Sequence, residues 1–363
     1  MRRGILSGRP PAVNGRSTPY NRRPSGMGER SAMVLVALAL LAAAPAAAQP
    51  ALTRRGPLPS RDEWLLAQPL LTLPAAAPDP LERRQIEVRL DGDWGSDFGW
   101  VGGLGGATGS LRYVVDGEHR SGSLTVRRGF GAGVTLGVRV PVLWRGPGIL
   151  DGVIDTWHRA LGFPDGGRSY FPDNCLRVDG RDTSRRPIAW QGRTGTGLGN
   201  VELEASEVLS GLEEARGWRT ALSLRASLPT ASAPFAGAGG GAGAQLLAAH
   251  PLGARADVYA GLGATLFTRR DVQGLDYRRL RPQGFLALEA RLTRGWSAIV
   301  QLDAAGRLVT NLDSYPGGTV YLRVGSKFGL RRGWMLEGGI TEGIIHQVAA
   351  TDFGFIAAVA RRF

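Results

Sequence analysis

The sequence alternates apolar and polar residues again and again along most of its length. Between residues 85 and 91 the apolar side chains of Ile86, Val88 and Leu90 alternate with polar ones. Because successive side chains of a β-strand point to opposite faces, this pattern gives a strand with one apolar and one charged face. The pattern recurs up to the last residue, which favours an all-β fold over a helical or disordered chain.

Turns and loops separate twelve predicted strands. They comprise residues 84–97, 120–130, 133–143, 198–209, 218–228, 241–251, 255–267, 282–292, 296–305, 317–330, 334–341 and 351–363. Short turns such as 131–133 alternate with longer loops such as 144–197, and the even number of strands returns both ends of the chain to the side of the short turns. This layout is typical of an outer-membrane barrel with short periplasmic turns and longer surface loops.

We therefore predict an all-β fold, an antiparallel up-and-down transmembrane β-barrel of about twelve strands, with one short helix in a long surface loop. Trp218, Trp296 and Trp334 each follow a short turn, as in the aromatic girdle of such a barrel. After residue 48 no apolar run approaches the roughly 18 residues that a spanning helix needs. A soluble sandwich or secreted barrel is the alternative, because alternation does not show which face points inward.

The first 48 residues have the features of an export signal. An apolar stretch at residues 33–44 follows Arg30, and residues 46–48 are the small residues of a cleavage site. This predicts a cleaved signal peptide within an N-terminal extension over residues 1–48, with the translation start at Met27 or Met33. The predicted location is the outer membrane of a Gram-negative bacterium.

Residues 49–83 form a proline-rich lead before the barrel, which is predicted over residues 84–363. Seven prolines in this lead exclude a central strand or a long helix. Its apolar runs, residues 64–66 and 70–73, would be unfavourable if they were exposed in the periplasm. Three placements stay open: a plug inside the barrel, a segment packed on the barrel rim, or a segment bound to a partner.

The charge of the chain does not indicate a nucleic-acid partner. The net charge is +13, with 44 Lys+Arg against 31 Asp+Glu. Residues 1–48 hold seven arginines and one glutamate, a net +6, so the chain without them carries +7. This remaining charge is scattered along the strands and loops, whereas nucleic-acid binding requires a basic patch or stripe.

The polar face of the predicted strands would line the barrel lumen. Acids and bases are nearly balanced there, which favours a cross-linked interior over a pore with rings of one charge. A twelve-strand barrel is wider than an eight-strand one, so a narrow or plugged channel is predicted, with purely structural ion pairing as the alternative. The predicted lumen-lining residues are Glu87, Arg89, Asp91, Arg139, Glu202, Glu204, Arg225, Asp257, Glu289, Arg291, Asp303, Arg323 and Glu337.

The longest predicted loop contains an amphipathic helix. Apolar residues recur there at intervals of three and four, opposite Asp151, Asp155 and Arg159, and Gly162 marks the end. The helix is predicted either to fold into the mouth of the barrel as a constriction or lid, or to cap the rim. Its apolar residues are Ile149, Leu150, Val153, Ile154, Trp157 and Leu161.

Short motifs spread along the chain point to a family. They are Gly56–Arg61, Leu90–Trp94, Ile149–Asp155 and Phe163–Arg168, followed by the closing Ala360–Phe363. Together they resemble the Gram-negative domain-of-unknown-function family 3187 over residues 56–363, and Phe-Pro-Asp-Gly-Gly-Arg is the most specific of them. The resemblance implies an outer-membrane barrel and brings no established activity.

The end of the chain carries an expected assembly signal. The last strand ends on Phe363, with Phe355 and Val359 on the same face. Such an end is similar to the strands that the barrel-assembly machinery prefers, although Arg361 stands where an aromatic residue is usual. The expected partners are this machinery together with outer-membrane lipid and lipopolysaccharide.

Few residues are placed to carry catalysis. His119, His158 and His346 fall in predicted loops and His250 at a strand end, and no Gly-x-Ser-x-Gly segment is present. No histidine pair has metal-ligand spacing, and Cys175 is the lone cysteine, a predicted free thiol. We therefore expect no enzyme, metal or cofactor. The predicted function is a narrow or gated passive channel for small solutes; the alternatives are a non-conducting structural or surface-interaction barrel and, third, an outer-membrane hydrolase.

Overall fold

The structure is a computed structural model that describes residues 54–102, 111–162, 166–184, 186–188, 194–209, 217–315, 317–344 and 350–363. The predicted signal peptide over residues 1–48 lies outside the described residues, and so does His346. Within the described ranges, no helix is both long enough and apolar enough to cross a membrane.

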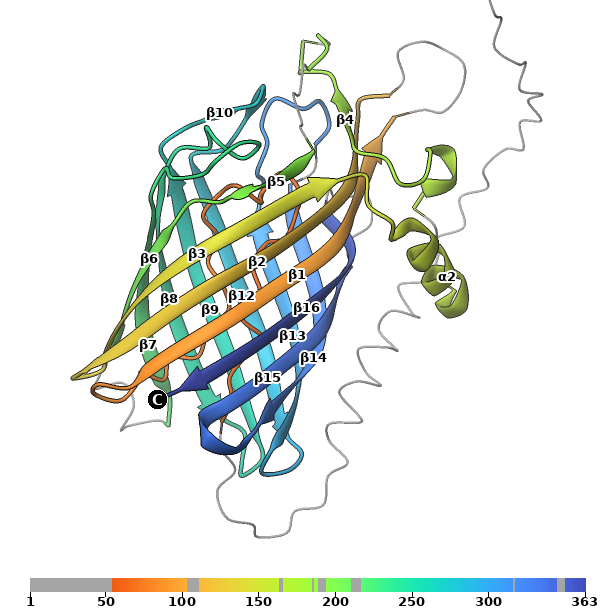
Figure 1. The fold of residues 1–363 in the computed structure, drawn as a ribbon. Coiled ribbons are helices and arrows are strands. Elements are labelled where there is room, and N and C mark those ends of the chain that lie inside the picture. Colours follow the sequence, from red (N-terminus) through yellow and green to blue (C-terminus); the bar gives the residue numbers. More distant parts are fainter. Residues whose placement is uncertain are drawn as a thin grey trace, which may run out of the picture. The chain divides into compact units, whose positions relative to one another are not determined.

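Twelve antiparallel strands of the described chain close into a barrel (Figure 1). The order around the ring is β1, β16, β15, β14, β13, β12, β9, β8, β7, β6, β3 and β2. Their bounds are β1 Ile86–Val101, β2 Tyr113–Gly131, β3 Val134–Gly146, β6 Glu202–Val208, β7 Arg219–Ser227, β8 Gly241–Pro251, β9 Ala256–Phe267, β12 Leu280–Arg291, β13 Trp296–Gly306, β14 Gly318–Gly329, β15 Trp334–Gly343 and β16 Ala350–Arg362. The predicted fold class is confirmed.

The first and last strands complete the ring. The backbones of Ile86 and Phe363 exchange two hydrogen bonds, of 2.9 and 3.2 Å, where β1 meets β16. Each of the twelve strands is therefore paired on both sides, which satisfies the backbone N–H and C=O groups without water. A membrane-spanning sheet requires this closure, because hydrocarbon offers no hydrogen-bond partner to a free edge.

The apolar face of the strands points outward. Leu90 and Leu262 are 55 % and 72 % exposed, whereas Arg89 and Glu289, on the alternate face, are 8 % and 0 % exposed. A large exposed apolar surface around a buried charged interior is unfavourable in water and suits a surrounding lipid phase. The alternative of a soluble sandwich or secreted barrel with an inward apolar face is therefore wrong.

Some strand ends differ from the predicted ones. β1 and β2 extend beyond the predicted ranges 84–97 and 120–130 toward the surface loops. There Tyr113–Val115 are fully buried, because the short strand β4 (Arg177–Gly180) pairs with β2 and apolar loop residues pack against it. Simple alternation disappears where neighbours cover both faces, so the predicted ranges of these two strands were too short on the side of the surface loops. β6 is shorter than predicted, since Gly195–Leu198 form a separate strand, β5, on β3.

The long loop contains the predicted helix. Helix α2 spans Asp151–Leu161, and Gly162 ends it in the left-handed conformation with φ 71°, donating its N–H to the carbonyl of His158. The remaining short elements are the 3₁₀ turns η1 (Arg168–Tyr170) and η2 (Arg331–Gly333) and the hairpin of β10 (Asp271–Val272) and β11 (Leu275–Asp276).

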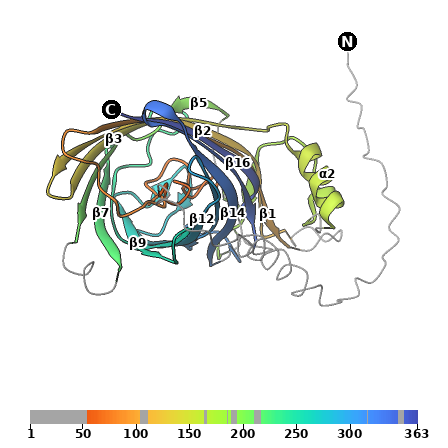
Figure 2. The same ribbon diagram turned by 90° about the horizontal axis from the view of Figure 1, so that it is seen from below.

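Residues 54–78 lie inside the barrel, where Figure 2 shows an orange trace within the ring of strands, and the mostly exposed residues 79–83 lead back to β1. Together they form a hairpin without helix or strand, here called the lead hairpin. The first limb, residues 54–63, starts near the short turn after β12, where Arg55 contacts the carbonyl of Arg294. The apex, residues 64–71, lies near the surface loops, and the second limb, residues 72–83, returns to β1.

An apolar core joins the apex to the surface loops. Trp64, Leu65 and Leu66 are almost completely buried. Burying side chains of this size stabilises the fold by roughly 1.5–3 kcal/mol each, so the apex is the apolar anchor of the lead hairpin. Its partners in the cluster are Tyr113, Val115, Val178, Val272, Leu275, Tyr277, Leu308, Val309, Leu312 and Tyr315.

The junction between the lead hairpin and β1 depends on Gly129 in β2. The carbonyl of Gly129 accepts the N–H of Arg84 at 2.9 Å, and a Cβ at this position would overlap the carbonyls of Leu81 and Glu82. We predict that Gly129→Ala lowers the free energy of unfolding by roughly 1–3 kcal/mol, measured by urea-induced unfolding in detergent. Gly152→Ala in α2, where nothing lies within 4 Å of the added Cβ, is the matched control. Equal urea midpoints for both variants would contradict the prediction.

Candidate functional site in the barrel lumen

A single carboxylate holds the start of the first limb. Glu289 of β12 accepts the backbone N–H of Arg55 at 3.0 Å and that of Gly56 at 3.1 Å. The hydroxyls of Tyr259 and Ser297 donate to the same carboxylate at 2.8 and 2.6 Å. Because a buried carboxylate is costly unless donors surround it, these four hydrogen bonds fix the position at which the lead hairpin enters the lumen.

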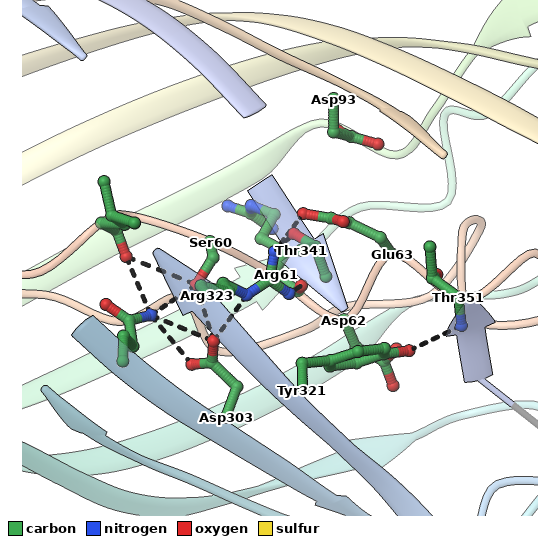
Figure 3. Close-up of polar contacts among 12 residues, drawn as sticks. Ser60, Arg61, Asp62, Glu63, Asp93, Asp303, Tyr321, Arg323, Thr341 and Thr351 are labelled. Carbon is green, nitrogen blue, oxygen red and sulfur yellow. Dashed lines mark hydrogen bonds and ion pairs between the residues drawn. The ribbon is translucent and has the colours of Figure 1, made fainter. Parts of the chain in front are cut away.

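The middle of the first limb is bound to β13 and β14 (Figure 3). The Ser60 hydroxyl donates to Asp303 Oδ2 at 3.0 Å, and Arg323 Nε donates to the same oxygen at 2.6 Å. Arg323 also donates through Nη2 to the carbonyl of Arg61 at 2.6 Å and through Nη1 to Glu63 Oε1 at 2.5 Å. Arg323 is thus the centre of the wall's contact with this limb.

Asp62 binds a further set of wall residues. The Tyr321 hydroxyl donates to Asp62 Oδ1 at 2.9 Å, and the Arg281 guanidinium forms an ion pair with the same carboxylate. The backbone N–H of Trp64 donates to Asp62 Oδ1 at 3.1 Å, which starts the turn at the apex. The contacts with Arg281 and Tyr321 therefore hold the limb against β12 and β14.

One ion pair crosses from the first limb to the other side of the lumen. Arg61 donates from Nη1 and Nη2 to the two carboxylate oxygens of Glu202 in β6, at 2.8 Å each. A two-point arginine–carboxylate pair is among the stronger polar contacts in proteins. Glu202 also pairs with Arg139 at 3.1 Å and with Arg225 at 3.6 Å, so it has three arginine partners.

The second limb is held by backbone hydrogen bonds and by an apolar cluster in which Ala75 packs with wall residues such as Leu247. The N–H of Leu73 donates to Gln283 Oε1 at 3.0 Å, and the N–H of Leu81 donates to Thr135 Oγ1 at 3.1 Å. These wall partners lie on β12 and β3. The two limbs and the apex together thus contact most of the circumference of the barrel from inside.

Little free space is left around the first limb. A cavity of about 30 Å³ lies between it and the wall formed by β1, β15 and β16, and one of about 40 Å³ lies toward β2, β3 and β6. A single water needs roughly 10–15 Å³ of such space, so each cavity holds only a few waters. Movement of the lead hairpin is therefore needed before any larger solute could cross.

The predicted lumen-lining residues make ion pairs or hydrogen bonds with one another, with other wall residues or with the lead hairpin. Glu202, Asp257, Glu289, Asp303 and Arg323 contact the lead hairpin directly. The other contacts connect neighbouring strands across the wall. They involve Glu87, Arg89, Asp91, Arg139, Glu204, Arg225, Arg291 and Glu337.

The predicted constriction helix is not in the lumen. Figure 2 shows α2 outside the ring of strands. Leu150 and Ile154 are buried against Phe353 of the outer wall, while Ile149 and Val153 are 65 % and 50 % exposed. The apolar stripe finds its partners on the outer face because the lead hairpin already fills the lumen. Trp157 also packs on this outer cluster, which includes Trp94 and Ile340, and the side chain of Leu161 lies outside the described residues.

The residues of the expected assembly signal lie on the outer side of β16. Phe355 and Phe363 are exposed, and Val359 pairs in register with Leu90, which points outward. Phe355 stacks edge-on against Phe353, with ring centroids 5.0 Å apart. The last strand therefore presents an apolar outer face and is fully paired with β1 and β15.

Two parts of the lumen site were missed in the sequence. The first is the polar run Ser60-Arg61-Asp62-Glu63, whose position directly before the apolar run of residues 64–66 was an available signal. The second is His119, which lies in β2 rather than in a predicted loop and is fully buried. Its Nδ1 lies 2.5 Å from Asp97 Oδ2 and its Nε2 3.3 Å from Asp93 Oδ1.

Cys175, in the loop before β4, is free of disulfide bonding. Its Sγ donates to Asp116 Oδ2 at 3.2 Å. Burial, together with the nearby Asp116 carboxylate, raises the pKa of the Cys175 thiol to about 12. The thiol therefore stays protonated near neutral pH, and a nucleophilic role is unfavourable because the thiolate is the reactive form.

One group of described side chains has the composition of a metal site. Ligand atoms of His158, Glu342 and Asp352 lie within 4.8 Å of one another on the outer side of the wall, beside α2. Asp352 already pairs with Arg168 at 3.0 Å, and Arg168 pairs with Asp151 at 2.6 Å. Arg168 therefore neutralises Asp352, one of the three residues of this group, and its two ion pairs connect the loop to the wall.

Sequence comparison places the chain in a family. A family model described as "Protein of unknown function (DUF3187)" matches residues 32–363. The chain belongs to the DUF3187 family. No curated protein matches the chain by sequence.

Solved structures with a similar fold are outer-membrane barrels. The COG4313 outer membrane channel from Pseudomonas putida F1 has a TM-score of 0.52 and 11 % identity, over 78 % of this chain and 97 % of that one. The NanC porin has a TM-score of 0.41 and 7 % identity, over 76 % and 97 % of the two chains. The P. putida toluene transporter TodX has a TM-score of 0.39 and 11 % identity, over 78 % and 91 %. The first likeness shows a shared outer-membrane barrel fold.

The contact at Glu289 can be tested directly. Hydrogen bonds to a charged group contribute roughly 1.5–3 kcal/mol, so Glu289→Gln should speed amide hydrogen exchange at Arg55 and Gly56 about tenfold or more. Mass spectrometry of the refolded protein measures this exchange. Glu207→Gln, at an exposed position of β6, is the control and should leave the exchange unchanged. Equal protection in the two variants would show that Glu289 does not hold the hairpin.

Proposed function

We propose that this DUF3187 protein is a passive outer-membrane channel for small solutes and that the lead hairpin is its plug. The observation that carries the proposal is a separate segment of the chain that fills the lumen through contacts with the surrounding wall. A wall whose own side chains fill the interior would need no such segment. The shared fold with a protein described as an outer membrane channel supports the proposal.

The chemistry of the contacts supports a plug that moves. The first limb is bound mainly by ion pairs and hydrogen bonds, such as Arg61–Glu202 and Ser60–Asp303, and water can replace these partners at a modest net cost. The apex and the second limb are bound in apolar clusters instead. Displacement of the first limb, with the apex still attached to the loops, would widen the lumen without unfolding the barrel.

A non-conducting structural or surface-interaction barrel is the second candidate. The observation in its favour is the apolar core at the apex, since burial of that size favours permanent closure of the loop side. The two candidates differ in whether current passes through the reconstituted protein. We assign no catalytic step, because the protonated Cys175 thiol and the ion-paired lumen acids offer no activated nucleophile.

Location and assembly follow from the same proposal. Residues 1–48 would direct export and be removed, and the barrel would then reside in the outer membrane of a Gram-negative bacterium. The apolar outer face would contact lipid and, on the loop side, lipopolysaccharide. Phe355, Val359 and Phe363 would present the last strand to the barrel-assembly machinery.

A disulfide between the first limb and the wall tests the plug. Ser60 Oγ and Asp303 Oδ2 of β13 lie 3.0 Å apart, so cysteine sulfurs at these two positions come within reach of each other, and Arg323 keeps Glu63 as its acidic partner. In a Cys175→Ser background, Ser60→Cys/Asp303→Cys should conduct in planar bilayers with reductant and lose most of its conductance when oxidised, because the first limb can then no longer move. The Cys175→Ser parent and the single variant Ser60→Cys are the controls.

Two outcomes would overturn the proposal. Equal conductance of the oxidised and reduced double variant would show that the lead hairpin is not a plug, once gel mobility has shown that the disulfide forms. The parent and the reduced double variant are first shown to be folded by their heat-dependent shift in electrophoretic mobility. If neither of them then passes current, the non-conducting barrel is favoured instead.

A further inference from the structure

The first limb divides the lumen into two unequal sides. On the side of β12, β13 and β14 it is bound at successive points by Glu289, Asp303 and Arg323. On this side the structure leaves a cavity of about 20 Å³. The opposite side holds the cavities of about 30 and 40 Å³, and there the Arg61–Glu202 pair is the direct side-chain bridge from the limb to the wall.

The two larger cavities meet at Arg61. This residue lines both of them, together with Glu63 and Asp93. Its guanidinium reaches Glu202 on β6 and so lies across the space between limb and wall. Removal of the side chain would therefore connect the two cavities along the first limb without touching the contacts to β12, β13 and β14.

Carboxylates outnumber arginines around these cavities. The arginines that line them are Arg61, Arg89 and Arg139. The carboxylates are Asp62, Glu63, Asp91, Asp93, Glu202 and Glu337. With six acids against three bases, the lining of this side is more acidic than the nearly balanced lumen as a whole, and an acidic lining attracts cations.

Two of these carboxylates are the most open to water. The side chains of Asp91 and Asp93 are 21 % and 17 % exposed, against 6 % for Glu202 and 2 % for Glu337. Asp91 lies 3.6 Å from Arg89 and 3.9 Å from Arg139, and Asp93 lies 3.3 Å from His119, whereas Glu202 and Glu337 have arginine partners at 2.8 and 2.7 Å. A carboxylate with longer and more hydrated ion pairs acts more strongly on a solute in the cavity than a tightly paired, buried one. Asp91 and Asp93 therefore set the field that a passing ion meets.

We infer that the plugged lumen contains a route for small cations along the β1–β2–β3–β6 side of the first limb, barred by the Arg61–Glu202 ion pair and made cation-selective by Asp91 and Asp93. The inference rests on the proposed channel function and names its solute class. Displacement of Arg61 removes its positive charge from the route and leaves the negative charges of Asp91 and Asp93. The same movement therefore opens the route and makes it prefer cations.

The Arg61→Ala variant is suited to the test because its partner stays neutralised. Glu202 keeps Arg139 at 3.1 Å and Arg225 at 3.6 Å, so no unpaired buried charge is created. Arg61→Ala should raise single-channel conductance in potassium chloride by about threefold or more, because the side chain that blocks the route is removed. Arg61→Lys, which keeps the charge, should stay closer to the parent chain.

Selectivity is measured by the reversal potential in a potassium chloride gradient. Arg61→Ala should favour potassium over chloride, and Arg61→Ala/Asp91→Asn/Asp93→Asn should lower the potassium-to-chloride permeability ratio by about threefold or more. Asp179→Asn, an exposed acid on β4, removes the same charge away from the cavities and should leave the ratio unchanged.

Failure of this inference is distinguishable from failure of the channel proposal. If the Ser60–Asp303 disulfide blocks current but Arg61→Ala does not raise it, the plug is real and the route lies elsewhere. An unchanged permeability ratio after the two aspartate substitutions would overturn the selectivity assignment alone. If the disulfide has no effect on an existing current, the plug itself is disproved, and this inference fails with it.

Discussion

The pairing of charges inside the barrel is the constraint on which the rest of the structure depends. Each strand that turns an apolar face to lipid turns a polar face to the lumen, and a buried charge is costly unless opposite charges or hydrogen-bond donors surround it. The wall satisfies part of this need by itself, as in the Arg89–Glu337 pair of 2.7 Å. The lead hairpin supplies further partners, with Arg61 for Glu202 and backbone N–H groups for Glu289.

The lead hairpin uses two kinds of contact for two purposes. Its apex is held by apolar burial, which does not depend on ion pairs that water entering the lumen could replace. Its first limb is held mainly by ion pairs and hydrogen bonds, which exchange with water and weaken as salt and solvent enter. A segment built in this way can stay attached at its apex while its first limb moves, which is the behaviour required of a plug in a passive channel.

Much of the barrel could be predicted because a period of two is a local property of the sequence. The run of Ile86, Val88 and Leu90 places the first strand without any knowledge of its neighbours. The predicted second strand, 120–130, began too late and left out Tyr113–Val115, because partners from other parts of the chain cover both faces there. The same limit hid His119, which lies in this extension of β2 between Asp93 and Asp97.

Placement of the apolar segments outside the strands was harder to predict than the strands. The apolar runs around Trp64 and Leu71 and the apolar stripe of α2 were recognised in the sequence. An apolar face indicates only that it packs against another apolar surface, and not which one. One segment found its partner inside the barrel and the other on the outer wall at Phe353. The lumen has room for one such segment, and the lead hairpin fills it. The lumen itself exists only after the ring of strands has closed, so the sequence pattern of either segment does not reveal its place.

The sequence by itself determined the strands, their number, their connections and the chemical contrast of their faces, because these follow from neighbours along the chain. The tertiary structure decided which face points outward in the described barrel, where residues 54–83 lie, and which of the lumen charges meet. Arg61 and Glu202 are 141 residues apart, and Arg323 and Glu63 are 260 apart. No local pattern records such pairs, since they exist only when a closed wall and an inserted hairpin bring distant charges into one water-poor space.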